Sequence, residues 1–329
     1  MKLFGRKSRD DSPVTDEEVL WAYRIALGRE PESARTVAEH RRGAANLLEL
    51  RRTFFNSIEF RNGMGRTIIS QIAPTFGATT APDIVSPDRA DLRDRMFRHI
   101  AKSWSNYGAT EAHWSVLTFD RYREETLGEN LDEFHRSGTA QVKSFRNALA
   151  RNGLELPKGG TCIELGCGVG RITRWLAPLF EKVIALDVSP GHLALAKEYV
   201  GRHAANVEFR QLRGIEDLDA LPPAEVFYTF LVLQHNPPPV IEAILDRIFA
   251  RLASQAIAYV HLPTFIPDYH FDAETYLAER EDRLDMEMHM LPQKDVFALC
   301  ARRGMQVLEV LNQTNELMMV ADCIVLKMA

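Results

Sequence analysis

The sequence has no apolar stretch that approaches the roughly 18 residues needed for a membrane-spanning helix. Its first residues, MKLFGRKSRDDS, carry positive charge, but no apolar core of a signal peptide follows them. From these two absences we expect a cytoplasmic protein that does not insert into a membrane.

An excess of basic charge is also missing. Lysine and arginine number 40 against 45 aspartate and glutamate residues, which gives a net charge of -5. Proteins that bind nucleic acid usually present a basic face to the phosphates, so we do not expect a nucleic-acid partner.

Cysteine is scarce, and its spacing is irregular. The four cysteines, none of which forms a CxxC pair, are Cys162, Cys167, Cys300 and Cys323. Because they lie in apolar or glycine-rich contexts, they predict buried free thiols rather than a disulfide framework or a zinc site.

What remains is an ordinary globular composition, 46% hydrophobic and 26% charged over 329 residues, which suits two domains. Thr15 with Glu18 three residues later predicts a helix N-terminus, and helical spacing of apolar residues continues from there. We predict a small helical domain at 14–66, a Pro/Gly-rich linker at 73–90, a helical lid or connector at 91–133 and a larger domain at 134–329.

The larger domain alternates predicted strands and helices. The strands are TCIEL, KVIALD, VEFRQL, AEVFYTF and AIAYVHL, with a helical pattern after most of them. Such alternation predicts an α/β fold with a parallel sheet covered by helices. The last segment supplies one helix and two strands joined by a polar turn, which predicts an antiparallel finish.

A glycine-rich turn follows the first of these strands. In CIELGCGVGR, three glycines at alternate positions can bring bare backbone N–H groups against a ligand at a helix N-terminus. The dinucleotide fingerprint GxGxxG would need a third glycine where Arg171 stands, which disfavours NAD. Glu164 suits a ligand with a positive amino group or sulfonium, and Asp187, ending the next strand, suits ribose hydroxyls. A simple tight turn and a helix-capping Asp187 are the alternatives.

IELGCGVGR and VIALDVSPGHL resemble the first motifs of class I S-adenosylmethionine-dependent methyltransferases, and the resemblance covers about residues 134–329. It implies a Rossmann-like sheet of seven strands with an antiparallel last strand, preceded here by the small all-α domain. It also implies a set of residues that contact S-adenosyl-L-methionine: Glu164, Gly166, Cys167, Gly168, Gly170, Asp187, Val188, His192, Ile215, Glu216, Phe230 and Leu231.

We expect the residues that bind the methyl acceptor to follow the later strands or to precede the sheet. His235 has the intrinsic pKa of a general base that could take a proton from an attacking hydroxyl, although a buried or capping histidine is an equal alternative. Candidates for acceptor binding are His113, Trp114, Arg136, Gln234, Thr264, Tyr269, Glu287 and His289. The histidine and glutamate spacings match no recognised ligand pattern, so no metal is expected.

The N-terminal segments YRIALGREPE and FFNSIEF resemble a helical domain of unknown function, similar to phycobilisome linker repeats, that accompanies bacterial enzymes acting on surface glycans. We therefore expect a bacterial methyltransferase that methylates a hydroxyl of a sugar or surface-glycan intermediate. The alternatives are N- or C-methylation of a small metabolite, a non-catalytic S-adenosylmethionine-binding module and an NAD-dependent oxidoreductase. The partner is a small-molecule or glycan acceptor, and a homo-oligomer stays open.

Overall fold

The computed structural model describes residues 13–55, 57, 59–60, 83–86, 88–157, 159–280, 283–314 and 319–329. The chain divides into two compact units, Met1–Thr80 and Ala81–Ala329. Residues 73–82 and 87 of the predicted linker lie outside the described residues. Within its described part lies a short strand, β1 (Asp83–Val85).

The N-terminal unit is helical, as the sequence predicts. It contains α1 (Asp16–Ala22), the π-helix η2 (Tyr23–Leu27), α2 (Ala34–Gly43) and α3 (Leu47–Phe55). The hydroxyl of Thr15 accepts the N–H of Glu18, whose carboxylate in turn accepts the N–H of Thr15 at 2.9 Å. This reciprocal pair satisfies two N–H groups at the start of α1. The relationship to linker repeats stays a prediction.

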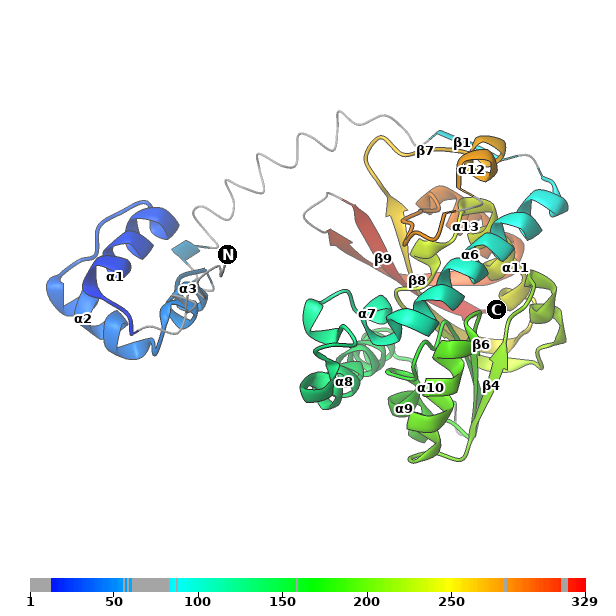
Figure 1. The fold of residues 1–329 in the computed structure, drawn as a ribbon, viewed down its shortest axis with the longest axis horizontal. Helices are drawn as coiled ribbons and strands as arrows, with labels where there is room; N and C mark the ends of the chain where they lie inside the picture. The colour runs from blue at the N-terminus through cyan, green and yellow to red at the C-terminus, as the bar shows by residue number, and fades with distance from the viewer. Residues whose placement is uncertain are drawn as a thin grey trace, which may run out of the picture. The chain divides into compact units, whose positions relative to one another are not determined.

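The second unit carries the sheet (Figure 1). After β1 its elements are α6 (Ala90–Thr110), α7 (Ala112–Val116), η3 (Asp120–Tyr122), α8 (Leu127–Arg151), β2 (Thr161–Leu165), α9 (Thr173–Leu176), η4 (Ala177–Leu179), β3 (Lys182–Asp187), α10 (Pro190–Gly201), β4 (Val207–Gln211), η5 (Ile215–Ala220), β5 (Ala224–Thr229), η6 (Leu233–His235), α11 (Pro238–Phe249), β6 (Leu252–Phe265), β7 (His270–Asp272), α12 (Ala273–Arg280), α13 (Gln293–Arg302), β8 (Met305–Thr314) and β9 (Val320–Met328). Among the described residues, no helix is long and apolar enough to cross a membrane.

Seven strands form one sheet in the order β4-β3-β2-β5-β6-β9-β8. The pairs from β4 to β6 are parallel, whereas β9 runs antiparallel to both of its neighbours. The predicted Rossmann-like sheet with an antiparallel last strand is confirmed. The small second sheet pairs β1 with β7 in parallel.

Helices cover both faces of the large sheet. One core contains Phe97 of α6 together with apolar residues of α11 and α13, and the other contains Phe145 of α8 and Leu176 of α9. With both faces covered, the central strands are apolar on both sides, which is why they lack polar alternation. Helix α6 packs against α10, α11 and α12, and this places it beside the carboxyl ends of the strands.

One predicted helix is much shorter than expected. The sequence RITRWLAPLF forms only the one-turn α9 and the 3-10 turn η4. Pro178 lies inside η4, where its missing N–H and its ring prevent an α-helix from continuing.

Candidate cofactor site

A cavity opens at the carboxyl ends of β2, β3 and β5, where the strand order reverses direction between β2 and β5. Ligands of open α/β sheets bind at such a switch point. Ten of the predicted residues line this cavity: Glu164, Gly166, Cys167, Gly168, Asp187, Val188, His192, Phe230, Leu231 and His235.

The glycine loop after β2 owes its shape to backbone geometry. Gly166 has a φ of 72°, and a Cβ at this position would collide with the side chain of Val232 after β5. Its N–H donates to the carbonyl of Leu186 at 2.7 Å, which ties the loop to β3. A glycine is therefore required at position 166 for conformation and for space.

Asp187 ends β3 and holds the same loop from the other side. Its Oδ2 accepts the N–H of Gly168 at 2.8 Å, and its Oδ1 accepts the N–H of Ser189 at 2.9 Å. Each carboxylate oxygen has a second lone pair, so Asp187 can still accept hydrogen bonds from a ligand in the cavity.

The cavity is also lined by a buried carboxylate, Glu164, and a buried guanidinium, Arg171. Burial raises the pKa of Glu164 to about 7, and the guanidinium of Arg171 opposes that rise. Arg171 donates through Nη1 to Ser137 and Gln141 of α8. Oε2 of Glu164 and Nε of Arg171 have no hydrogen-bond partner within the described part of the chain. They are two of nine buried side-chain atoms without a partner among the described residues, and a ligand with opposite charges would supply partners for both.

Helices α6 and α7 contribute the remaining walls. From α6 come Phe97, Ile100 and Trp104, and from α7 come Ser115 and Val116. Val116 lies within 2.9 Å of the position that a Cβ on Gly168 would occupy. The lid that the sequence placed at 91–133 thus supplies cavity residues, although they differ from those predicted.

Leu231, just after β5, adopts a left-handed conformation with a φ of 61°. Such a conformation is strained for a leucine and persists only where the surroundings impose it. Its N–H lies 3.4 Å from Nδ1 of His261, and the ring of Phe230 packs on that histidine with centroids 4.6 Å apart. This strained residue lines the cavity. Strained backbone conformations are frequent at functional sites.

His235 in η6 is buried beside the cavity. Burial lowers its pKa to about 4, so the imidazole is neutral at pH 7. Nδ1 donates to the main-chain carbonyl of Glu287 at 2.7 Å, which leaves Nε2 with the lone pair. The ring of Trp104 packs against it, with centroids 4.9 Å apart.

Three predicted cofactor residues do not line the cavity. Gly170 faces α10, where a Cβ would lie 2.6 Å from Val200, so its small size serves helix packing. Ile215 is buried in the hydrophobic core, and Glu216 lies with it along a separate surface cleft. Their adenine contacts stay a prediction that the structure does not support.

The predicted acceptor residues are also set apart from the cavity. His113 contacts the rings of Phe134 and His135, Trp114 lies under Arg123, and Arg136 is exposed on α8. Thr264 donates to the buried Asp322 at 2.8 Å, which is a structural bond. The amide nitrogen of Gln234 lies 3.2 Å from Nε2 of His235.

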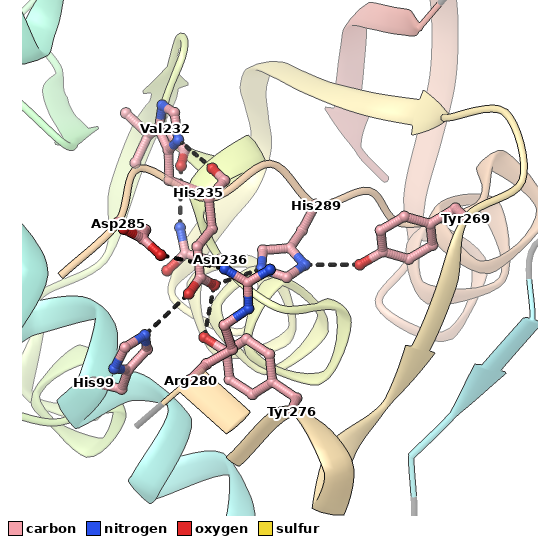
Figure 2. Close-up of polar contacts among 10 residues, drawn as sticks. His99, Val232, His235, Asn236, Tyr269, Tyr276, Arg280, Asp285 and His289 are labelled. Atoms are coloured by element: carbon pink, nitrogen blue, oxygen red, sulfur yellow. Dashed lines mark hydrogen bonds and ion pairs between the residues drawn. The ribbon is translucent and has the colours of Figure 1, made fainter. Parts of the chain in front are cut away.

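Tyr269, Glu287 and His289 come together in a second cleft of about 480 Å³. Figure 2 shows the polar chain, in which Tyr269 reaches Nδ1 of His289 at 2.7 Å. Nε2 of His289 lies 2.9 Å from Oε2 of Glu287. The structure therefore brings these three residues together, and their side chains form hydrogen bonds with one another.

The sequence did not point to Arg171 as a cofactor residue, nor to the cavity residues of α6. In the sequence Arg171 marks only the departure from the dinucleotide pattern; its place directly after the glycines is the signal that the sequence offers, and its burial in the cavity wall appears only in the structure. For α6 no local signal exists, because its cavity residues also belong to an ordinary amphipathic pattern.

Within the described ranges, no cluster of three or more histidine, cysteine, aspartate or glutamate side chains could hold a metal ion. The four cysteines are buried and free, which confirms the expectation for the thiols.

Residues 162–255 match a family described as methyltransferase domain. Human N-terminal Xaa-Pro-Lys N-methyltransferase 1 is 27% identical over 159 residues, which cover 47% of this chain and 69% of that protein. Carboxy-S-adenosyl-L-methionine synthase from Dichelobacter nodosus is 30% identical over 152 residues, 44% of this chain and 61% of that protein. The solved structure of magnesium protoporphyrin IX methyltransferase from Synechocystis with bound SAH aligns with a TM-score of 0.47 and 16% identity, covering 70% of this chain and 100% of that one.

These matches indicate an S-adenosylmethionine-dependent methyltransferase. The chain spans about two thirds of the length of the two curated relatives. They differ in the reaction that their names describe, so the acceptor of this protein does not follow from them.

Proposed function

We propose that this protein transfers a methyl group from S-adenosylmethionine to a hydroxyl of a sugar or glycan intermediate. The observation that carries the donor site is the unpartnered, buried pair of Oε2 of Glu164 and Nε of Arg171 in one cavity. The methionine half of the donor has an ammonium and a carboxylate, which complement this pair. Asp187, which lines the same cavity, has free lone pairs for ribose hydroxyls.

When bound, S-adenosylmethionine supplies a sulfonium methyl group, which passes to the acceptor oxygen as the sulfur–carbon bond breaks and its electron pair stays on sulfur. His235 takes the hydroxyl proton on Nε2 when the acceptor displaces the amide N–H of Gln234, which lies 3.2 Å from that atom, while Nδ1–H stays on the carbonyl of Glu287. A base with a pKa near 4 suffices, because the methylated oxygen is far more acidic than the free hydroxyl. Holding the reactants in line supplies most of the rate enhancement.

The second cleft supports an acceptor with several hydroxyls. Because His289 donates through Nε2 to an ionised carboxylate, its Nδ1 accepts the phenol proton of Tyr269. The phenol oxygen then presents lone pairs to the cleft, which Asp272 and Glu279 also line. These oxygen atoms are hydrogen-bond acceptors, and they suit the O–H groups of a sugar.

A second candidate acceptor is an amine. The carboxylates of Asp272 and Glu279 in the second cleft would attract a cation, whereas Asp285 is paired with Arg280 of the same cleft. One relative is named an N-methyltransferase. Such an amine attacks the methyl group in its unprotonated form, because a base with a pKa of about 4 does not take the proton from an ammonium group. The two candidates share the donor site and differ in the acceptor.

The donor is tested by calorimetry with S-adenosylmethionine, S-adenosylhomocysteine and NAD, of which only the first two should bind. Methyl-labelled donor is then incubated with bacterial extract separated into glycan, small-metabolite and protein fractions. Label in the glycan fraction supports the proposal, label in an amine-containing fraction favours the second candidate, and the absence of label in every fraction contradicts methyl transfer.

The role of His235 is tested with His235→Ala on the fraction that takes the label. Turnover should fall at least about 100-fold with donor affinity unchanged. Arg146→Ala, at an exposed position of α8, is the control for loss of a polar side chain. Unchanged turnover in His235→Ala would exclude the base.

A further inference from the structure

Glu287 lies between α12 and α13 and is 9% exposed. Its carboxylate receives three hydrogen bonds, from Nε2 of His99 at 3.0 Å, from the hydroxyl of Tyr276 at 2.8 Å and from Nε2 of His289 at 2.9 Å (Figure 2). These donors come from α6, α12 and the segment of Glu287 itself. The carboxylate is therefore the junction of three separate parts of the fold.

Burial by itself would raise the pKa of Glu287, but the hydrogen bonds from His289, His99 and Tyr276 hold it well below the usual range. An ionised carboxylate only accepts hydrogen bonds, and three of its roughly four lone-pair positions are used inside the protein. This arrangement argues against the direct contact with the acceptor that the sequence predicts for Glu287.

The main chain of the same segment holds the proposed base. The carbonyl of Glu287 accepts Nδ1–H of His235 at 2.7 Å, and the N–H of His289 donates to the carbonyl of Gln234 at 2.7 Å. Two hydrogen bonds thus join residues 287–289 to residues 234–235. A shift of Glu287 would move the group that orients the imidazole.

Helix α6 is tied to the same point. His99 anchors it to the carboxylate, and one turn further along Trp104 packs on the imidazole of His235. The carboxylate of Glu287 thus restrains Trp104, which packs on the imidazole of His235, and also the main-chain carbonyl that fixes the tautomer of His235.

We infer that Glu287 is a positioning residue for methyl transfer, which acts through His235 by keeping it as the Nδ1–H tautomer with its lone pair on Nε2. The inference rests on the proposed role of His235 as the proton acceptor. This role requires no contact between the carboxylate of Glu287 and the donor or the acceptor.

The tautomer is measured directly by nitrogen-15 NMR of labelled imidazoles in the full chain, with the His235 signals identified by their loss in His235→Ala. The wild type should show Nδ1 protonated and Nε2 unprotonated at neutral pH. In Glu287→Gln the amide NH₂ opposes at least one of the three donors, so a second tautomer or an averaged signal should appear. Glu274→Gln, the same change at an exposed position of α12 outside the second cleft, should leave the His235 signals as in the wild type.

Tyr276→Phe is the milder second variant, because it removes one donor and keeps the ring. It should shift the tautomer population in the same direction by a smaller amount. If Glu287→Gln does not fold, this variant decides the question. An unchanged Nδ1–H tautomer in the variants that fold overturns the inference.

Kinetics separate this inference from the proposed function. On the labelled fraction, Glu287→Gln should lower kcat about 10- to 100-fold with KM for the donor unchanged. If His235→Ala keeps full turnover, the proposed base is wrong, whatever the tautomer in Glu287→Gln. If His235→Ala is inactive while Glu287→Gln keeps both its tautomer and its kcat, only the positioning role fails.

Discussion

The carboxylate of Asp187 accepts the main-chain N–H of Gly168 at 2.8 Å, so the end of β3 and the glycine loop after β2 form one unit. The residue proposed to hold the ribose is also the residue that fixes the loop. Cofactor affinity and local stability are thereby linked at a single side chain.

Asp187→Ala should reduce the affinity for S-adenosylhomocysteine at least about 10-fold and lower the unfolding free energy by about 1–3 kcal/mol, because two buried N–H groups lose their acceptor. Calorimetry and chemical denaturation measure the two effects. Asp132→Ala, at an exposed position of α8, is the control. Full affinity in Asp187→Ala would contradict the ribose role.

Glu164→Gln should change stability in a pH-dependent way. The folded-state pKa of about 7 exceeds the ordinary 4.5, so the protonated side chain favours folding at low pH, and that contribution is lost as the pH rises through 7. Without ligand, the variant should therefore be more stable than the wild type at pH 8, by about 1–3 kcal/mol, and nearly equal at pH 5.

Denaturation at the two pH values checks this difference, with Glu129→Gln on the exposed surface of α8 as the control. The same ionisation governs the pairing with the ammonium group of the donor. Wild-type affinity for S-adenosylmethionine should fall as the pH drops below 7, whereas Glu164→Gln should bind weakly at both values. A stability difference that does not vary with pH would count against the buried charge.

Arg171→Met should weaken the binding of S-adenosylmethionine at least about 10-fold and leave the binding of 5′-methylthioadenosine unchanged. The reason is that 5′-methylthioadenosine lacks the carboxylate that the guanidinium is proposed to bind. Calorimetry with both ligands makes the comparison. Arg136→Met, exposed on α8, controls for the loss of a positive charge. An equal loss for both ligands would show that Arg171 acts on the fold rather than on the methionine half.

Gly166→Ala should destabilise the domain by about 2–4 kcal/mol, since alanine must adopt a φ of 72° and its Cβ collides with Val232. In Gly166→Ala/Val232→Ala the collision is removed and the backbone strain remains. A double-mutant cycle by denaturation should therefore give a favourable coupling of about 1 kcal/mol. No coupling would mean that the backbone strain accounts for the whole effect.

The features that sequence predicted well depend on short segments. The apolar strands, the glycines after TCIEL and the aspartate that ends KVIALD each carry a local pattern, and the number of strands with the antiparallel last strand follows from the resemblance to a known family. The capping pair of Thr15 and Glu18 is equally local. Residues close together in the sequence determine these features, so a short segment is enough to predict each of them.

Features that sequence missed depend on contacts between distant segments. His99 and Glu287 are 188 residues apart and meet only because α6 packs beside the segment after α12. Val232 approaches Gly166 across two neighbouring strands in the same way. Periodicity indicates that α6 has an apolar face, but not that Trp104 ends beside His235.

Phe97 of α6 belongs both to the hydrophobic core and to the wall of the cavity. A helix shared in this way cannot swing aside without exposing side chains that hold the domain together. Any movement of α6 that widens the cavity therefore also disturbs the core contacts of Phe97, so ligand exchange and domain stability depend on the same side chain.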